Sequence, residues 1–269
     1  MTDPLLRIAE ALERLSPQPA RADATSGNWF VWSEGSLAAV ARPRITPLTL
    51  YAGVDAQRDA LAENARRHSS GLAAHDVLLW GARGMGKSSL VRAVHAGLID
   101  AGADAALAQL AQPDLPQLPD LFRHLAAVPR RFTVFLDDLS LDGDDGKAHA
   151  LRSLLDGGVM ARPDHVRLVV TSNRRNLVPR NQSDTDQTNP RDAADDQLAL
   201  ADRFGLRLGF HACDQADYLA ICSNYARAHG LVFDPAAALA WSAGRGARSG
   251  RVAWQFTVET AGAQGKPLA

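Results

Sequence analysis

The sequence predicts an α/β fold: a three-layer domain built on a five-stranded parallel sheet, followed by a small C-terminal helical domain. Three observations carry this prediction. Apolar runs of strand length alternate with helical patterns between residues 49 and 212, which is typical of a parallel sheet covered by helices on both faces. A glycine-rich loop joins the first of these runs to a helix. From residue 214 onward the strand signal stops and three helical patterns follow.

The first expected strand leads directly into a phosphate-binding loop. Val77 to Trp80 is a short apolar run suited to a buried parallel strand. The next eight residues match the pattern G-x-x-x-x-G-K-[ST], and a helix is expected over 89–98. Such a loop turns consecutive backbone N–H groups inward and adds the positive end of a helix dipole. We therefore expect a nucleoside triphosphate to bind at Gly81, Ala82, Arg83, Gly84, Met85, Gly86, Lys87, Ser88 and Ser89.

Two side chains of this loop have specific expected roles. Lys87 would reach the β and γ phosphates, and Ser88 would place its hydroxyl on Mg²⁺. The alternative is a glycine-rich turn that precedes a helix by chance. The strand before the loop and the helix after it favour the phosphate site.

The other elements follow from apolar runs and helical spacing. Further strands are expected at 105–110, 132–136, 166–171 and 206–210. Helices are expected at 55–68, 118–127, 147–155 and 198–204, and in the C-terminal region at 216–228, 235–243 and 250–261. Residues 178–197 are polar and show no apolar periodicity, which predicts a mobile loop.

The region before the sheet carries two features. An amphipathic helix is expected over 4–15, and the aromatic segment Trp29–Trp32 is expected to pack on the core, with a partner surface as the alternative. The chain then divides into an N-terminal segment packed on the core, an α/β nucleotide-binding domain and a C-terminal helical lid, with bounds 1–48, 49–212 and 213–269.

Polar residues follow two of the expected strands. Asp137 and Asp138 come directly after the strand at 132–136, and Asn173 follows the strand at 166–171. The first carboxylate would support Mg²⁺ and the second would polarise a water for attack on the γ phosphate. An asparagine can hydrogen-bond both a water and a phosphate oxygen without adding charge. The alternative reading is an acidic cap that ends a strand and opens a turn.

Composition narrows the class of protein. The 269 residues carry a formal net charge of −1, which gives no general attraction to nucleic acid or to an acidic membrane surface. Cys213 and Cys222 are too few for a disulfide framework or a zinc site. The sequence opens without a signal-peptide pattern and has no apolar run of membrane-spanning length, so a cytoplasmic protein is expected.

In combination, these motifs resemble the AAA+ ATPases, a branch of the P-loop NTPases with an ASCE-type sheet. By that resemblance Arg203, in the stretch Leu-Ala-Asp-Arg-Phe-Gly, would be an arginine finger for a neighbouring subunit, with a surface salt bridge as the alternative. Arg251 would contact the γ phosphate of its own chain; the weaker candidates are Arg245 and Arg248. The residues expected to line the adenine are Tyr51 and Val54.

More narrowly, the sequence resembles a bacterial AAA+ family catalogued as domain of unknown function number 815. The likeness runs from about Trp29 to Val258 and rests on strings such as Phe-Leu-Asp-Asp-Leu-Ser and Arg-Ser-Gly-Arg-Val-Ala. It implies ATP binding and hydrolysis but names no cellular task. Many AAA+ proteins carry Asp-Glu at the strand end where this chain has Asp-Asp, so the rate of hydrolysis is left open. Arg174 and Arg175 could also face a neighbour's nucleotide.

The expected function is therefore Mg²⁺-dependent ATP binding and hydrolysis by a homo-oligomer that remodels or loads a protein client. A nucleotide-gated adaptor with little turnover is the main alternative, and a P-loop kinase is a weaker one. Nucleic-acid binding is disfavoured because no helix-turn-helix follows the lid and no basic arm is present. The client itself cannot be identified from these motifs.

Overall fold

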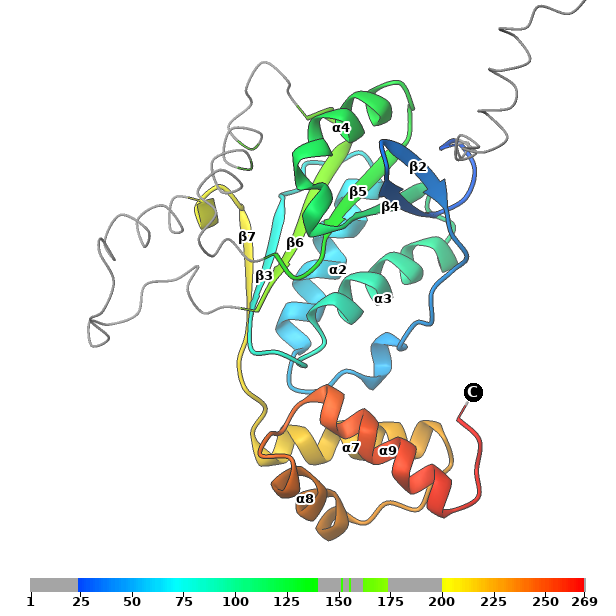
Figure 1. The fold of residues 1–269 in the computed structure, drawn as a ribbon, viewed down its shortest axis with the longest axis vertical. Helices are drawn as coiled ribbons and strands as arrows, with labels where there is room; N and C mark the ends of the chain where they lie inside the picture. The colour runs from blue at the N-terminus through cyan, green and yellow to red at the C-terminus, as the bar shows by residue number, and fades with distance from the viewer. Residues whose placement is uncertain (1–23, 140–150, 152–154, 156–161, 174–199, 269) are drawn as a thin grey trace, which may run out of the picture.

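The computed structural model describes residues 24–139, 151, 155, 162–173 and 200–268. Within these residues a twisted sheet lies between layers of helices, and a separate group of C-terminal helices lies at one end of the sheet (Figure 1). The predicted α/β class is confirmed. The expected helix at 4–15, most of the one at 147–155 and the loop at 178–197 lie outside the described residues.

The described sheet has seven strands in the order β2-β1-β4-β5-β6-β3-β7. All neighbours pair in parallel except β2 and β1, which are antiparallel. The five predicted strands are present, with bounds that differ by at most one residue at either end: β3 (Val77–Gly81), β4 (Ala105–Leu110), β5 (Arg131–Leu136), β6 (Val166–Ser172) and β7 (Leu206–Phe210). The strand β3 that precedes the glycine-rich loop lies between β6 and β7.

The expected count of five strands is wrong for the described residues. The aromatic segment forms β1 (Trp29–Ser33), which pairs with β4, and the following residues turn back as β2 (Ser36–Ala39). Aromatic and β-branched side chains favour strands, and in β1 they serve both faces of the sheet, with Phe30 in one core cluster and Trp29 in the other. The segment is therefore part of the sheet and does not simply pack against it.

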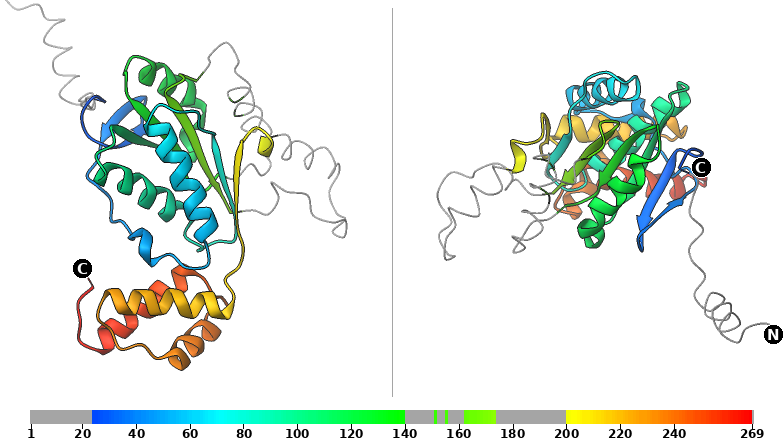
Figure 2. Two further views of the ribbon diagram at one scale, coloured as in Figure 1. Left: turned by 180° about the vertical axis from the view of Figure 1, so that it is seen from behind. Right: turned by 90° about the horizontal axis from the view of Figure 1, so that it is seen from above.

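Helices cover both faces of the sheet (Figure 2). The helices α2 (Asp55–Ser69) and α3 (Lys87–Asp100) contribute to one core cluster, and α4 (Leu118–Ala126) contributes to the other. Short 3-10 turns precede α2 and α4, at Leu48–Leu50 and Gln112–Gln117. Because β3, β5 and β6 are parallel, their carboxyl ends lie at the same edge of the sheet, the one that faces the C-terminal helices (Figure 1).

The C-terminal group consists of α7 (Gln215–Ala228), α8 (Pro235–Gly244) and α9 (Gly250–Ala263). Each begins within one residue of its predicted start, and a side-chain oxygen caps its first turn, in order from Asp214, Asp234 and Ser249. The start of α9 contacts the glycine-rich loop, since the backbone N–H of Arg251 donates to the carbonyl of Gly84 at 3.1 Å. No helix in the described part of the chain is long and apolar enough to cross a membrane.

Candidate nucleotide site

The loop between β3 and α3 can be formed only by the glycines that the motif supplies. Gly81 has a φ of 124°, and a Cβ there would lie 2.1 Å from the carbonyl oxygen of Phe210 on β7. Gly84 and Gly86 also have positive φ angles, 75° and 86°. The turn that they make delivers the chain into the first turn of α3, which starts at Lys87. The amino end of a helix therefore borders the site and presents its positive dipole there.

Lys87 is held by the loop that it follows and by the neighbouring strand β6. Its Nζ donates to the carbonyls of Gly81 and Ala82 at 3.0 and 2.8 Å and to Oδ1 of Asn173 at 2.9 Å. Only 5% of the residue is exposed. Burial lowers the pKa of Lys87 to about 8, against the opposing pull of the two strand-end aspartates. The ammonium is thus desolvated and partnered mainly by neutral oxygens, an arrangement that an anion would complete.

The carboxylate of Asp137 faces the loop and two further side chains. Its Oδ1 accepts hydrogen bonds from the hydroxyls of Ser88 and Thr171, the latter at 2.7 Å. Its Oδ2 lies 3.9 Å from the guanidinium of Arg92 on α3. A hydroxyl and a carboxylate brought together in this way are the oxygen ligands that Mg²⁺ takes alongside phosphate and water. The residues therefore fit the metal expected at Ser88 and Asp137.

Asp138 is fixed by both its backbone and its side chain. Its φ is +55°, a left-handed conformation that is uncommon outside glycine. Its N–H donates to Oγ1 of Thr171 at 2.8 Å, and its carboxylate accepts from Nδ2 of Asn173. Asn173 therefore links Lys87 to Asp138. The structure brings together the lysine, the two aspartates and the asparagine that the sequence placed at neighbouring strand ends.

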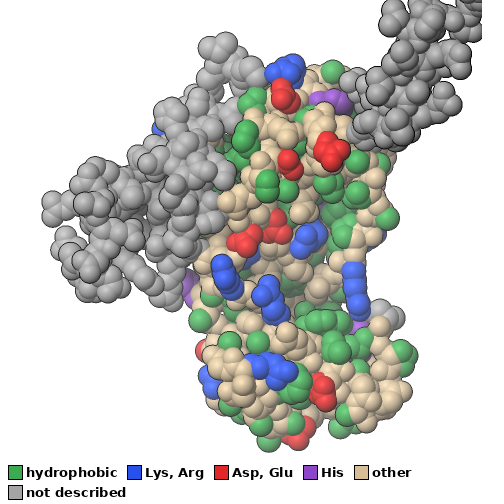
Figure 3. Space-filling view, viewed as in Figure 1, with side chains coloured by type: hydrophobic (Ala, Val, Ile, Leu, Met, Phe, Trp, Pro, Cys, Tyr) green, Lys and Arg blue, Asp and Glu red, His purple; other side chains and the backbone are tan. Residues whose placement is uncertain are grey.

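These side chains line a cavity of about 410 Å³ between the sheet edge and the C-terminal helices. Acidic and basic side chains gather on the surface at that level (Figure 3). The loop residues from Gly84 to Ser89 line it, as do Arg251 and the expected base contacts Tyr51 and Val54. Of the other expected loop contacts, Gly81, Ala82 and Arg83 do not line it, and Arg83 is exposed.

One wall of the cavity is apolar and aromatic. It is formed by side chains from the segment before α2 and from the C-terminal helices: Leu50, Tyr51, Ala52, Val54, Ile221, Tyr225 and Trp254. The phenol of Tyr51 donates to Oγ of Ser89 at 2.7 Å, and burial raises the pKa of Tyr51, so the group stays neutral. The rings of Tyr225 and Trp254 meet edge to face at 5.2 Å. A planar heterocycle fits such a wall.

Several of these lining residues were missed by reading the sequence. Thr171 lies two positions before Asn173 at the same strand end, and Arg92 lies one helical turn after Ser88, so each could have been found by spacing. Trp254 lies one turn after Arg251 on α9. No sequence signal marks Tyr225, which reaches the cavity only because α7 packs beside α9.

The arginine candidates differ in whether they line the cavity. Arg251 lines the cavity, whereas Arg245 stacks on Trp241 with its guanidinium 3.4 Å from the ring centroid, and neither it nor the exposed Arg248 lines the cavity. Arg203 also lies outside the cavity, just before β7 begins. Arg174 and Arg175 are outside the described residues.

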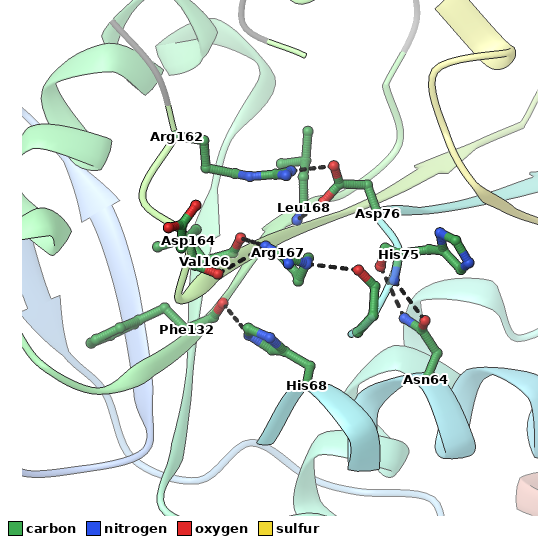
Figure 4. Close-up of polar contacts among 11 residues, drawn as sticks. Asn64, His68, His75, Asp76, Phe132, Arg162, Asp164, Val166, Arg167 and Leu168 are labelled. Carbon is green, nitrogen blue, oxygen red and sulfur yellow. Dashed lines mark hydrogen bonds and ion pairs between the residues drawn. The ribbon is translucent and has the colours of Figure 1, made fainter. Parts of the chain in front are cut away.

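Arg203 lies at the opposite edge of the sheet from the loop. The first residue of β7, Leu206, is in register with Val77, and its N–H donates to the carbonyl of Asp76. Asp76 belongs to a group of polar contacts at this amino edge (Figure 4), where it accepts from Arg162 and from the backbone N–H of Leu168. The length of β7 therefore separates Arg203 from the cavity of its own chain, about 15 Å along the strand.

A family model described as "Protein of unknown function (DUF815)" matches residues 25–264. The chain belongs to this family. Among solved structures it is similar to a RuvB variant from Thermotoga maritima, with a TM-score of 0.55 and 18% identity over 84% of this chain and 68% of that one. Orc1 from Aeropyrum pernix, solved in complex with DNA, has a TM-score of 0.57 and 17% identity over 82% of this chain and 62% of that one. No curated protein matches the sequence.

These likenesses show the fold: the DUF815 chain has the AAA+ P-loop architecture predicted from its motifs. At such low identity they carry no statement about substrate or partner. In the described part of the chain no three His, Cys, Asp or Glu side chains cluster as metal ligands. A magnesium ion held by one carboxylate, one hydroxyl and the phosphates of its nucleotide needs no such cluster.

Proposed function

We propose that this DUF815 protein binds ATP with Mg²⁺ and hydrolyses it. The observation that carries the proposal is the hydrogen-bonded chain from Lys87 through Asn173 to Asp138 at the rim of one cavity, with Ser88 and Asp137 beside it. Each of these groups is of a kind that a terminal phosphate and its metal need. Their convergence on one cavity from β3, β5 and β6 supports a shared purpose.

The proposed roles follow from chemistry and position. Lys87 binds the β and γ phosphates, and Ser88 and Asp137 hold Mg²⁺, which when bound offsets negative charge on the phosphates. Asp138 accepts a proton from the attacking water, and Asn173 orients that water and the lysine. Arg251 adds a positive charge from α9. Arg251 lines the cavity, and its backbone N–H donates to the carbonyl of Gly84 in the loop that precedes Lys87.

The apolar wall is the proposed site of the adenine. Tyr51 and Val54, expected there from the sequence, are joined by Tyr225 and Trp254. Stacking on aromatic rings and contact with aliphatic side chains suit a purine base. Because this wall combines residues of the sheet domain with residues of α7 and α9, a bound nucleotide would hold the two parts together, and the C-terminal helices would act as a lid.

Arg203 is proposed to complete the site of a neighbouring copy. Its position at the amino edge of the sheet disfavours a direct role at its own nucleotide, and an arginine fork is suited to the charge that develops on a transferred phosphoryl group. The protein would then act as a homo-oligomer on a protein client. The alternative remains an adaptor in which the bound nucleotide matters and turnover does not.

Hydrolysis measured against protein concentration tests the proposal. Specific activity should rise with concentration, because each site needs a second copy. Arg203→Ala and Asp138→Asn should each be inactive, and mixing the two should restore activity, because an Asp138→Asn subunit still offers its arginine to an Arg203→Ala neighbour. The matched control is Arg207→Ala, which removes an exposed arginine of β7 paired with Asp202.

The outcomes separate the two readings of the site. Tight ATP binding without turnover at any concentration would leave only the adaptor. Activity that is independent of concentration and survives Arg203→Ala would contradict a site shared between copies and would still support the proposed ATPase. Absence of ATP binding by the wild-type protein would refute the proposal as a whole.

A further inference from the structure

Thr171 is the residue through which β6 holds the strand-end aspartates of β5. Main-chain pairing between these two strands runs to Leu136 and Val170. Thr171 is the next residue of β6, and it is 1% exposed. Its own contacts therefore decide where the chain goes after β5 ends.

Thr171 makes one hydrogen bond to each of three consecutive residues, Asp137, Asp138 and Leu139. Its Oγ1 donates to Oδ1 of Asp137 at 2.7 Å and accepts from the N–H of Asp138 at 2.8 Å, and its carbonyl accepts from the N–H of Leu139 at 2.8 Å. A hydroxyl has one proton to donate and lone pairs with which to accept, so both side-chain bonds are satisfied at once. The hydroxyl contacts one aspartate through its carboxylate and the other through its backbone.

We propose that the Thr171 hydroxyl is a positioning group of the nucleotide site: it orients the Asp137 carboxylate toward the metal and holds Asp138 in the backbone conformation that its reaction requires. The proposal rests on the proposed ATPase function and assigns to that site a cavity-lining residue that acts through the two aspartates.

The two bonds act on separate steps of the function. Without the donated bond, Asp137 keeps Ser88 as its hydroxyl partner and is free to rotate, which weakens Mg²⁺ binding. Without the accepted bond, the N–H of Asp138 loses this partner. The residue, whose φ is +55°, can then relax away from that angle. Lys87 and the glycine-rich loop keep their own contacts, so binding of metal-free nucleotide is unaffected.

Thr171→Val tests this because valine keeps the shape of the side chain and removes the hydroxyl. Groups that orient a metal ligand typically contribute about 10- to 100-fold to metal affinity or activity. We expect Thr171→Val to raise the half-saturating Mg²⁺ concentration and to lower kcat, together by about that factor, while the affinity for ATP measured in EDTA stays at the wild-type value. Thr171→Ser should restore both quantities.

Thr257→Val is the matched control. Thr257 is also buried, and its hydroxyl also donates one hydrogen bond, to the carbonyl of Ala253 on α9, away from the cavity. Both valine variants should lose thermal stability. Only Thr171→Val should change the Mg²⁺ dependence. An equal effect of the two variants on Mg²⁺ half-saturation would show that Thr171 has a structural role only.

Hydrogen exchange in the nucleotide-free protein gives a readout that does not depend on activity. The amide of Asp138 should exchange faster in Thr171→Val, while that of Leu139, which is bonded to the Thr171 carbonyl, should stay protected. An unchanged Asp138 amide would refute the inference even if the wild-type protein hydrolyses ATP. The expected exchange pattern in a protein that binds no ATP would refute the proposed function and restrict Thr171 to holding the strand end.

Discussion

Lys87 provides a direct electrostatic test of the site, because its charge is buried before any phosphate arrives. The pKa of a free lysine is 10.5, and burial lowers that of Lys87 to about 8. Between these two values the unfolded chain holds a proton that the folded chain has released, so the free energy of unfolding rises with pH. From about pH 7 to about pH 10 this linkage amounts to about 2.5 kcal/mol. Lys87→Met lacks the titrating group and therefore lacks this gain.

The measurement is urea unfolding of the wild-type protein and of Lys87→Met at a series of pH values without nucleotide. All other titrating groups occur in both proteins, so the difference between the two curves isolates Lys87. The wild-type protein should gain stability relative to the variant as the pH rises through 8. Curves that stay parallel from about pH 7 to about pH 10 would show that the ammonium is well solvated, which would contradict the burial argument.

A second arm of the same experiment adds ATP. A polyanion beside the ammonium favours its charged form and raises the pKa of Lys87 back toward 10.5. With saturating ATP the wild-type gain between about pH 7 and about pH 9 should therefore disappear. Persistence of the gain in the presence of bound ATP would place the phosphates away from Lys87.

Three further substitutions test the scaffold around the site. Gly81→Ala should prevent stable folding, because the new Cβ would lie 2.1 Å from the Phe210 carbonyl oxygen; a wild-type melting temperature would contradict this. Arg130→Met should lower the free energy of unfolding by about 2 to 4 kcal/mol in urea titrations. The buried guanidinium donates to the side chains of Asp104 and Asn28 and to the carbonyls of Gly27 and Ala105, and it thereby ties the start of β1 to the start of β4. Ser249→Ala should cost about 1 kcal/mol by the same measurement, because it removes the cap of α9.

The parts of this molecule that the sequence predicted are those in which a local pattern determines the outcome. Buried parallel strands are continuous apolar runs, so Phe132 to Leu136 could be recognised without its neighbours. The phosphate loop is predictable because its positive φ angles, 124° at Gly81 and 86° at Gly86, favour the glycines that the motif specifies. Asn173 could be placed beside Lys87 because parallel strands end at a common edge.

The parts that were missed depend on contacts between distant segments. The aromatic run Trp29 to Trp32 reads equally well as a packed segment and becomes a strand only because β4 offers an unpaired edge, to which Arg130 also ties it. The hydroxyl of Thr171 acquires its contacts from the register of β5 against β6. Tyr225 and Trp254 face the cavity only because the C-terminal helices dock over the loop. Spacing from Asn173 and Arg251 could have pointed to Thr171 and Trp254, but the contacts themselves arise only in the folded chain.

The direction of the strands bears on the proposal that the site is shared between copies. In a parallel sheet all carboxyl ends lie at one edge and all amino ends at the other. Lys87, Asp137 and Asn173 follow carboxyl ends, whereas Arg203 precedes the amino end of β7, whose register with β3 is continuous from Leu206 to Phe210. No rotamer of an arginine spans that length. The proposed role of Arg203 at a phosphate therefore needs the nucleotide of another copy, so the proposals of an arginine finger and of an oligomer are tested together by the mixing experiment.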